Sequence, residues 1–281
     1  LQAKEERKGR LLSLFKTEAP DLFIVELYPF GRKAFSFEID PILKGIKSGK
    51  LPRSRVICSL RDILVEKKDA ADYEARVIDL LNCYFDALLI HADPRVLKLE
   101  ETFSRIKDIT VPIYYTGFVT PKPAPMAGER LRHQLSIHDE EILCVASAGG
   151  GTVGNTLLLA VVKAFELMNT DKPRQLHVFT GPFFSKEAFA RLQSLAGRDV
   201  RIFRFTTDFL SYLASADLSV SMAGYNTCMN IAAAGVPALV WPFSQNREQR
   251  LRALRLAQLG VLRVLTEEEL TPRRLGAIME Q

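Results

Sequence analysis

Short apolar runs alternate with longer segments of helical pattern along the whole chain. In the first half these runs span residues 21–26, 55–60, 87–91 and 111–115. Apolar runs of this length that are separated by helices are typical of parallel β-strands, because the connection between two parallel strands needs a long crossover. The pattern therefore predicts βαβ units in this half.

The alternation starts again after residue 140, where we expect six further strands. They span residues 142–147, 175–180, 200–205, 218–221, 238–241 and 261–264. Six strands make a full doubly wound sheet, whereas four are fewer than such a sheet usually has. The first half also lacks a glycine-rich first turn, and Leu1 lies in an apparent helix. We therefore expect two Rossmann-like α/β units, the first incomplete because residues are missing before Leu1.

A segment rich in proline and glycine separates the two halves. Residues 120–128 have the sequence TPKPAPMAG, and proline favours extended backbone over helix. We therefore predict an incomplete N-terminal domain over 1–118, a linker over 119–140 and a C-terminal domain over 141–281.

The composition is that of a globular protein. Of the 281 residues, 47% are hydrophobic and 25% are charged, which excludes collagen-like and wholly disordered classes. Lys and Arg number 38 against 33 Asp and Glu, for a net charge of +5. This mild excess suits a phosphate-bearing ligand, an anionic membrane surface or a plain basic protein. Since no block of Lys and Arg interleaves with aromatic residues, we expect no nucleic-acid partner.

The cysteines and histidines show no metal-binding spacing. None of the four cysteines belongs to a CxxC motif, so we expect buried free thiols in a reducing compartment. The four histidines form no HxxxH or HExxH pair, so we expect no metal site. No apolar run reaches the ~20 residues of a membrane span, and we identify no signal peptide. The sequence therefore predicts a cytoplasmic protein.

Two glycine-containing turns follow strands of the second half. Residues 147–152 (SAGGGT) and 221–227 (SMAGYNT) each connect a strand to a helix. Glycine lets the backbone approach a pyrophosphate, and a helix N-terminus offers N–H groups to it. Tight turns that use glycine for positive φ are the alternative, with Gly224 turning the chain and Asn226 or Thr227 capping the next helix. Two such turns at one sheet edge favour a phosphate site.

A third motif, residues 242–249 (PFSQNREQ), places four consecutive polar residues before a helix. Amides and carboxylates can together bind the hydroxyl groups of a sugar. The alternative is a helix start in which Asn246 is the cap and Glu248 complements the helix dipole.

The order and spacing of the three motifs resemble the C-terminal domain of GT-B glycosyltransferases. The closest likeness is to the N-acetylglucosaminyltransferases that form lipid II and to their predicted-glycosyltransferase relatives. It covers about residues 141–281 and rests on 216–224, 231–239 and 242–249. The resemblance implies an α/β fold of GT-B type, with two Rossmann-like doubly wound parallel sheets facing a cleft. The first half matches more loosely, as part of an acceptor-side domain.

The resemblance implies a hexosyl- or N-acetylhexosaminyltransferase that uses a UDP-sugar, with UDP-N-acetylglucosamine as one candidate, and needs neither metal nor cofactor. The glycine loop and the 224–227 turn would lie near the diphosphate, Thr206 near the uracil, and Glu248 and Gln249 on the donor sugar. Asn230 stands where the family has a glutamate for the ribose. The implied donor-binding residues are Gly149, Gly150, Gly151, Thr206, Gly224, Tyr225, Asn226, Thr227, Asn230, Asn246, Glu248 and Gln249.

The catalytic base is not assigned by the resemblance, because the family's glycine-rich loop with its catalytic histidine would precede Leu1. Glu26 and Asp62 follow strands of the first half and are our candidates for the base or for orienting the acceptor. Arg32 is a candidate for an acceptor phosphate. Helix caps and solvated loop charges are the alternative for each of these residues.

Other functions of the same fold stay open. They are a nucleotide-sugar epimerase or hydrolase, and a non-catalytic nucleotide-sugar-binding or truncated protein. The acceptor is unknown, and both a lipid-linked molecule and a saccharide are candidates. The basic stretch over 44–55 is expected to be a solvated helix face, with at most peripheral membrane contact. Homo-oligomerisation is expected if an apolar face of the incomplete first unit is exposed.

Overall fold

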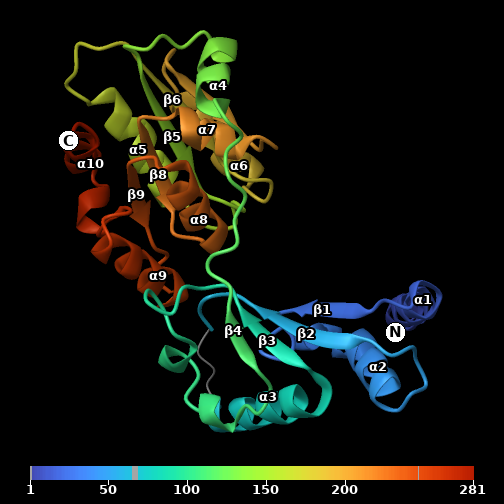
Figure 1. Ribbon diagram of the computed structural model, residues 1–281. Helices are drawn as coiled ribbons and strands as arrows, with labels where there is room; N and C mark the ends of the chain where they lie inside the picture. Colours follow the sequence, from blue (N-terminus) through green and yellow to red (C-terminus); the bar gives the residue numbers. More distant parts are fainter. Residues whose placement is uncertain (1, 65–68, 246) are drawn as a thin grey trace. The chain divides into compact units, whose positions relative to one another are not determined.

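The computed structural model describes residues 2–64, 69–245 and 247–281 (Figure 1). The chain divides into two compact units, Leu1–Val119 and Thr120–Gln281. Each unit contains one sheet, of four strands in the first and six in the second, and all of the strand pairs are parallel.

The first unit has the strand order β1-β2-β3-β4, so each strand pairs with the next along the chain. The strands are β1 (Leu22–Glu26), β2 (Arg55–Leu60), β3 (Ala87–Ile90) and β4 (Ile113–Tyr115). The α-helices are α1 (Gln2–Glu18), α2 (Ser36–Lys47) and α3 (Ala70–Tyr84). Short 3-10 turns are η1 (Lys33–Phe35), η2 (Leu99–Glu101) and η3 (Ile106–Asp108).

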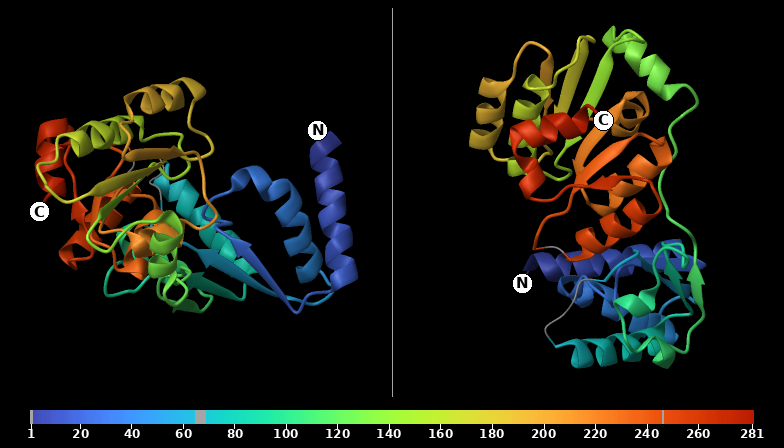
Figure 2. Two further views of the ribbon diagram at one scale, coloured as in Figure 1. Left: turned by 90° about the horizontal axis from the view of Figure 1, so that it is seen from above. Right: turned by 90° about the vertical axis from the view of Figure 1, so that its left-hand side faces the viewer.

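The core of the first unit lies on one face of β2 and β3. Val56, Cys58 and Leu60 alternate along β2 and are almost fully buried, as the two-residue period of a strand requires. Helices α1 and α2 lie side by side (Figures 1 and 2) around a small apolar cluster that includes Phe15. Strand β1 is an edge strand, and its Ile24 side chain is 54% exposed.

The second unit has the strand order β10-β9-β8-β5-β6-β7. The strands are β5 (Ile142–Ser147), β6 (Arg174–Phe179), β7 (Val200–Phe203), β8 (Leu218–Met222), β9 (Ala238–Trp241) and β10 (Arg263–Val264). The helices are α4 (Ala127–Leu135), α5 (Asn155–Glu166), α6 (Lys186–Leu195), α7 (Phe209–Ser215), α8 (Tyr225–Ala234), α9 (Arg247–Gln258) and α10 (Pro272–Met279), with the 3-10 turn η4 (Glu268–Leu270).

Strand β5 lies in the interior of this sheet and is buried along nearly its whole length. A strand covered on both faces has a continuous apolar sequence, which is why the pattern identified it. Helix α5 is buried on most sides, and α10 lies along it (Figure 2). The two helices approach closely at Gly276, where an added Cβ would lie 3.0 Å from the carbonyl oxygen of Ala164.

Ten expected strands are present at the expected places, and several details differ. The segment expected to be a linker contains α4, which packs on α7. Helix α8 begins at Tyr225 with Gly224 as its N-cap, so the expectation that Asn226 or Thr227 caps it was wrong. Both residues lie inside the first turn, because the backbone already becomes helical at Tyr225.

The expectation of buried cysteines was wrong for Cys83, whose position on α3 is exposed, and the other three are buried. Among the described residues, no helix has the length and apolarity that crossing a membrane requires.

Candidate functional site

A pocket lies at the carboxyl edge of the second sheet. The chain leaves β5 toward β6 and β7 on one side and returns to place β8 and β9 on the other. The loops after β5 and β8 therefore diverge, and ligands of open α/β sheets bind at such a switch point. The pocket has a volume of about 180 Å³ and is lined by Ser147, Gly149, Phe179, Gly181, Arg204, Phe205, Thr206, Phe209, Asn226, Thr227 and Asn230.

The glycines near this pocket divide into two kinds. A Cβ added at Gly181 would lie 2.3 Å from the carbonyl oxygen of Gly149, and one at Gly151 would lie 2.5 Å from that of Thr180. These glycines allow the β5 and β6 loops to pack backbone against backbone. At Gly149 and Gly150 the nearest atoms would be 4.0 and 3.9 Å away, which is ordinary van der Waals contact, and they belong to side chains rather than to backbone. Only this second kind leaves room for a ligand beside the backbone.

The first turn of α8 forms the opposite side of the pocket. Asn226 is exposed, whereas Thr227 is 9% exposed, with its Oγ1 4.0 Å from the position of a Cβ at Gly149. The carboxamide oxygen of Asn230 accepts a hydrogen bond of 3.0 Å from Thr120 Oγ1. The gap between the β5 loop and α8 is therefore lined by hydroxyl and amide groups next to a helix N-terminus, which favours a bound anion.

Aromatic side chains form a third side. Phe179 packs edge-to-face on Phe209 with ring centroids 5.4 Å apart, and Phe205 is 66% exposed. Arg204 also lines the pocket, and its guanidinium lies 4.2 Å from the ring centroid of Phe189. An aromatic wall beside polar groups is suited to a flat heterocyclic ring, because a base can stack there while its edge is hydrogen-bonded.

Five of the sequence-predicted donor residues line this one pocket: Gly149, Thr206, Asn226, Thr227 and Asn230. The predicted residues Gly150 and Gly151 belong to the adjoining β5 loop, and Gly224 and Tyr225 to the start of α8. Sequence reasoning missed Phe179, Gly181, Arg204 and Phe209. One signal was available for Gly181, because a Gly-Pro pair follows β6 directly.

The residues expected to bind the donor sugar have partners within their own unit. Glu248 Oε1 accepts a 2.7 Å bond from Arg252, which is 2% exposed and lies 5.3 Å from the ring centroid of Tyr225. The side-chain oxygen of Gln249 accepts a bond from the backbone N–H of Phe243 at 3.1 Å. Neither lines the pocket, and their contact with a sugar stays a prediction. Asn246 lies outside the described residues.

The two candidate catalytic carboxylates differ in their exposure to solvent. Glu26, at the end of β1, is half-exposed and accepts bonds from Arg32 at 2.5 Å and Arg61 at 2.9 Å. Asp62 follows β2, is 1% exposed and accepts a bond from the backbone N–H of Ile63 at 2.9 Å. Solvent therefore reaches Glu26 but not Asp62, and Arg32 is held by a carboxylate of its own unit.

A polar network lies at the same edge of the first sheet. His91 Nε2 is 2.7 Å from Ser59 Oγ, and Nδ1 is 2.8 Å from Thr116 Oγ1. Burial lowers the pKa of His91, and the charge of Glu26 partly opposes this effect. A lowered pKa favours the neutral ring near pH 7. Among the described residues, no group of three or more His, Cys, Asp and Glu is placed to hold a metal ion.

Comparison with known proteins agrees with this arrangement. Residues 143–280 match the family described as Glycosyltransferase family 28 C-terminal domain. A UDP-N-acetylglucosamine--N-acetylmuramyl-(pentapeptide) pyrophosphoryl-undecaprenol N-acetylglucosamine transferase from Methylibium petroleiphilum is 28% identical over 207 residues, which are 67% of this chain and 55% of that protein. The enzyme of the same name from Histophilus somni is 23% identical over 69% of this chain and 53% of its own length.

Solved structures show the same likeness. The crystal structure of MurG from Acinetobacter baumannii aligns with a TM-score of 0.56 at 16% identity, over 97% of this chain and 67% of that one. The spinosyn forosaminyltransferase SpnP aligns with a TM-score of 0.62 at 12% identity, over 97% and 69%.

These likenesses define the class of protein: the chain has the GT-B fold of glycosyltransferases, with two Rossmann-like units. Residues 143–280, which make up most of the second unit, match glycosyltransferase family 28 at its C-terminal domain. The chain spans about half the length of these two curated relatives.

Proposed function

We propose that the chain acts as a glycosyltransferase whose second unit binds a UDP-sugar. The observation that carries the proposal is the pocket at the switch point of a family 28 domain. It combines open glycine backbone, a helix N-terminus and an aromatic wall. A nucleoside diphosphate presents the complementary groups, since its base can stack and its diphosphate can accept N–H bonds.

UDP-N-acetylglucosamine is the donor that we propose, because the names of the curated relatives state this nucleotide sugar. Gly149, which lines the pocket, and its neighbour Gly150 would lie beside the diphosphate, where an added methyl group would meet no backbone atom within 4 Å. Thr206 would meet the base, and Asn230 the ribose hydroxyls, to which an amide can donate and from which it can accept. Glu248 and Gln249 are proposed to meet the sugar.

The acceptor in the names of those relatives is a pyrophosphoryl-undecaprenol conjugate. For this chain we propose an acceptor hydroxyl on a saccharide or on a lipid-linked sugar. Glu26 is the better of the two candidate bases, because it is half-exposed whereas Asp62 is buried. Free cysteines at all four positions support a reducing, cytoplasmic compartment.

Calorimetric titration of the full chain with UDP, UDP-N-acetylglucosamine, GDP and ADP tests the proposal. We expect uridine nucleotides to bind selectively. Asn226→Ala should weaken UDP by about tenfold, the usual effect of losing one hydrogen bond to a charged group. The matched control is Gln193→Ala, which removes an exposed amide on α6, outside the pocket. Absence of UDP binding, or equal binding by the Asn226 variant and wild type, would refute the proposed donor site.

A further inference from the structure

The first unit contains a pocket that the donor site does not use. It has a volume of about 500 Å³ and lies between the loop after β1 and the N-terminal half of α3. This volume is in the range of small-molecule binding sites. We call it the α3 pocket; its charged lining residues are Arg32, Lys33, Asp69, Asp72 and Arg76.

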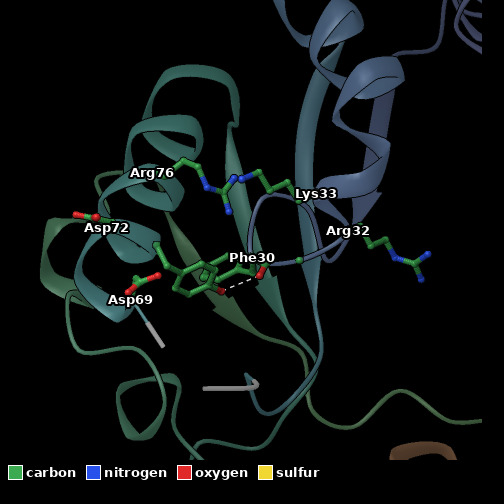
Figure 3. A pocket seen from close by; sticks show the side chains of 8 residues that line it. Phe30, Arg32, Lys33, Asp69, Asp72 and Arg76 are labelled. Atoms are coloured by element: carbon green, nitrogen blue, oxygen red, sulfur yellow. Dashed lines mark hydrogen bonds between the residues drawn. The ribbon is translucent and has the colours of Figure 1, made fainter. Parts of the chain in front are cut away.

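The charges of the α3 pocket are separated by sign (Figure 3). Lys33 and Arg76 extend toward one another from the loop and from α3, while Asp69 and Asp72 lie away from them, near the N-terminal end of α3. Arg32 points away, toward its partner Glu26. Within the described part of the chain, no ion pair involves Lys33, Arg76, Asp69 or Asp72.

Two converging cations without a carboxylate repel one another, and an anion between them relieves this repulsion. The contacts that hold Arg76 among the described residues are weak. Its guanidinium lies 6.0 Å from the ring centroid of Tyr73 and donates a long 3.4 Å bond to the carbonyl oxygen of Pro29. Its remaining donors can therefore form the paired bonds that guanidinium makes to phosphate.

The loop that carries Lys33 is fixed in an unfavourable backbone conformation. Leu27 and Arg32 have φ values of 65° and 52°, in the left-handed region that is unfavourable for residues other than glycine. Burial of Phe30, which packs edge-to-face on Phe103 at 5.3 Å, holds the loop in place. Strain that the surrounding packing maintains is typical of ligand-binding segments.

Tyr73 also lines the α3 pocket. Its hydroxyl donates a 2.7 Å bond to the carbonyl oxygen of Phe30 (Figure 3). Burial raises the pKa of Tyr73 to about 12, so the hydroxyl stays protonated and uncharged. The ring of Tyr73 offers an apolar surface for a sugar ring.

We propose that the α3 pocket binds a phosphorylated saccharide, with the phosphate between Lys33 and Arg76 and sugar hydroxyls donating to Asp69 and Asp72. A simple anion would leave the carboxylate side unused. A molecule with a phosphate at one end and hydroxyl groups at the other satisfies both sides. The binding site is inferred from residues of the first unit alone. Only the suggestion that its ligand is the acceptor of sugar transfer rests on the proposed glycosyltransferase function.

The test is calorimetric titration of the full chain in excess UDP, which keeps the ligand out of the donor pocket. The probes are N-acetylglucosamine 1-phosphate, inorganic phosphate and N-acetylglucosamine. We expect the sugar phosphate to bind more tightly than either part alone. Lys33→Gln and Arg76→Gln should each weaken it about tenfold or more. Asp72→Asn should weaken the sugar phosphate but not inorganic phosphate. Lys107→Gln, which removes an exposed cation outside the pocket, is the matched control.

A phosphorylated saccharide can be free in solution or can be the head group of a lipid. Vesicles of phosphatidylcholine with and without phosphatidylinositol distinguish these sources, because the inositol head group also joins a phosphate to a ring of hydroxyls. Binding only to inositol-containing vesicles, lost in Arg76→Gln, would identify a lipid-borne ligand.

Arg76→Lys distinguishes loss of the site from loss of folding, because it keeps the charge but not the paired bonds and should therefore bind phosphate more tightly than Arg76→Gln and less tightly than wild type. If neither soluble probes nor vesicles bind, or if binding is the same in Lys33→Gln and Arg76→Gln as in wild type, the inferred site is wrong. If UDP fails to bind while the sugar phosphate still binds through these residues, the proposed donor function is wrong and the α3 pocket stands.

Discussion

Alanine substitutions at Gly149 and Gly181 can be compared directly, because the first is expected to affect ligand binding and the second the packing of the backbone. Both glycines have positive φ, 64° and 89°, so replacement by alanine costs each of them about 1–2 kcal/mol in backbone conformation. At Gly149 the added methyl meets nothing closer than 4.0 Å. At Gly181 it would lie 2.3 Å from the carbonyl oxygen of Gly149, so two backbone segments must separate. Such overpacking adds about 1–3 kcal/mol.

We therefore expect Gly181→Ala to reduce the free energy of unfolding by about 2–5 kcal/mol, and Gly149→Ala by only about 1–2 kcal/mol. The methyl of Gly149→Ala would instead occupy the gap toward Thr227 where the diphosphate is proposed to lie. Loss of one or two charge-assisted hydrogen bonds there should weaken UDP by about ten- to a hundredfold.

Urea unfolding followed by tryptophan fluorescence measures the stability part. The single tryptophan, Trp241, is in β9, so its emission reports the second unit alone. UDP titration of the folded variants measures the binding part. A folded Gly149→Ala variant that binds UDP as wild type does would show that no ligand enters this gap. Equal stability of the two variants would refute the packing argument.

Two further predictions concern the same unit. His177 is fully buried, and burial lowers its pKa to about 4, so the unfolded chain binds a proton at higher pH than the folded one. The free energy of unfolding should therefore fall by about 2 kcal/mol between pH 7 and pH 5. A His177→Gln variant measured by the same urea assay should lose this pH dependence. A variant whose free energy of unfolding changes with pH as in wild type would contradict the prediction. Glu248→Ala removes a carboxylate bonded to the buried Arg252, so it should lower stability by about 2 kcal/mol, and Glu248→Gln by less. An unchanged urea midpoint for Glu248→Ala would show that this pair does not support the fold.

Much of the fold was predictable because parallel strands buried on both faces have apolar sequences. The run over 142–147 became β5 over the same residues. Helix α2 was predicted only at its C-terminal end, within the basic stretch over 44–55, since a proline at position 41 and aromatic residues near its start obscure the helical period. The helix ends at Lys47, so the expectation of a helix over the rest of that stretch was wrong. Helix α4 was hidden because it follows a proline-rich stretch. It is stabilised by packing on α7, where a Cβ at Gly128 would lie 2.3 Å from the carbonyl oxygen of Ala214.

The donor site was predictable in part, because a glycine turn after a strand is a local signal. The sequence placed Gly149 and Gly151 together without distinguishing them. The structure shows that Gly151 packs against the β6 loop and that Gly149 lines the pocket. The aromatic wall was missed because Phe179 and Phe209 meet only after β6 and α7 have packed.

By itself, the sequence determined the alternation of strands and helices, the two-unit organisation of the α/β fold and the glycine turns, since these depend on local pattern. Only the tertiary structure decided which side chains share a pocket. Lys33 and Arg76 belong to the segment after β1 and to α3. Gly149 belongs to the loop after β5 and Asn226 to the first turn of α8, on either side of a switch point. No local pattern encodes such neighbours, because strand order and helix packing bring distant segments together.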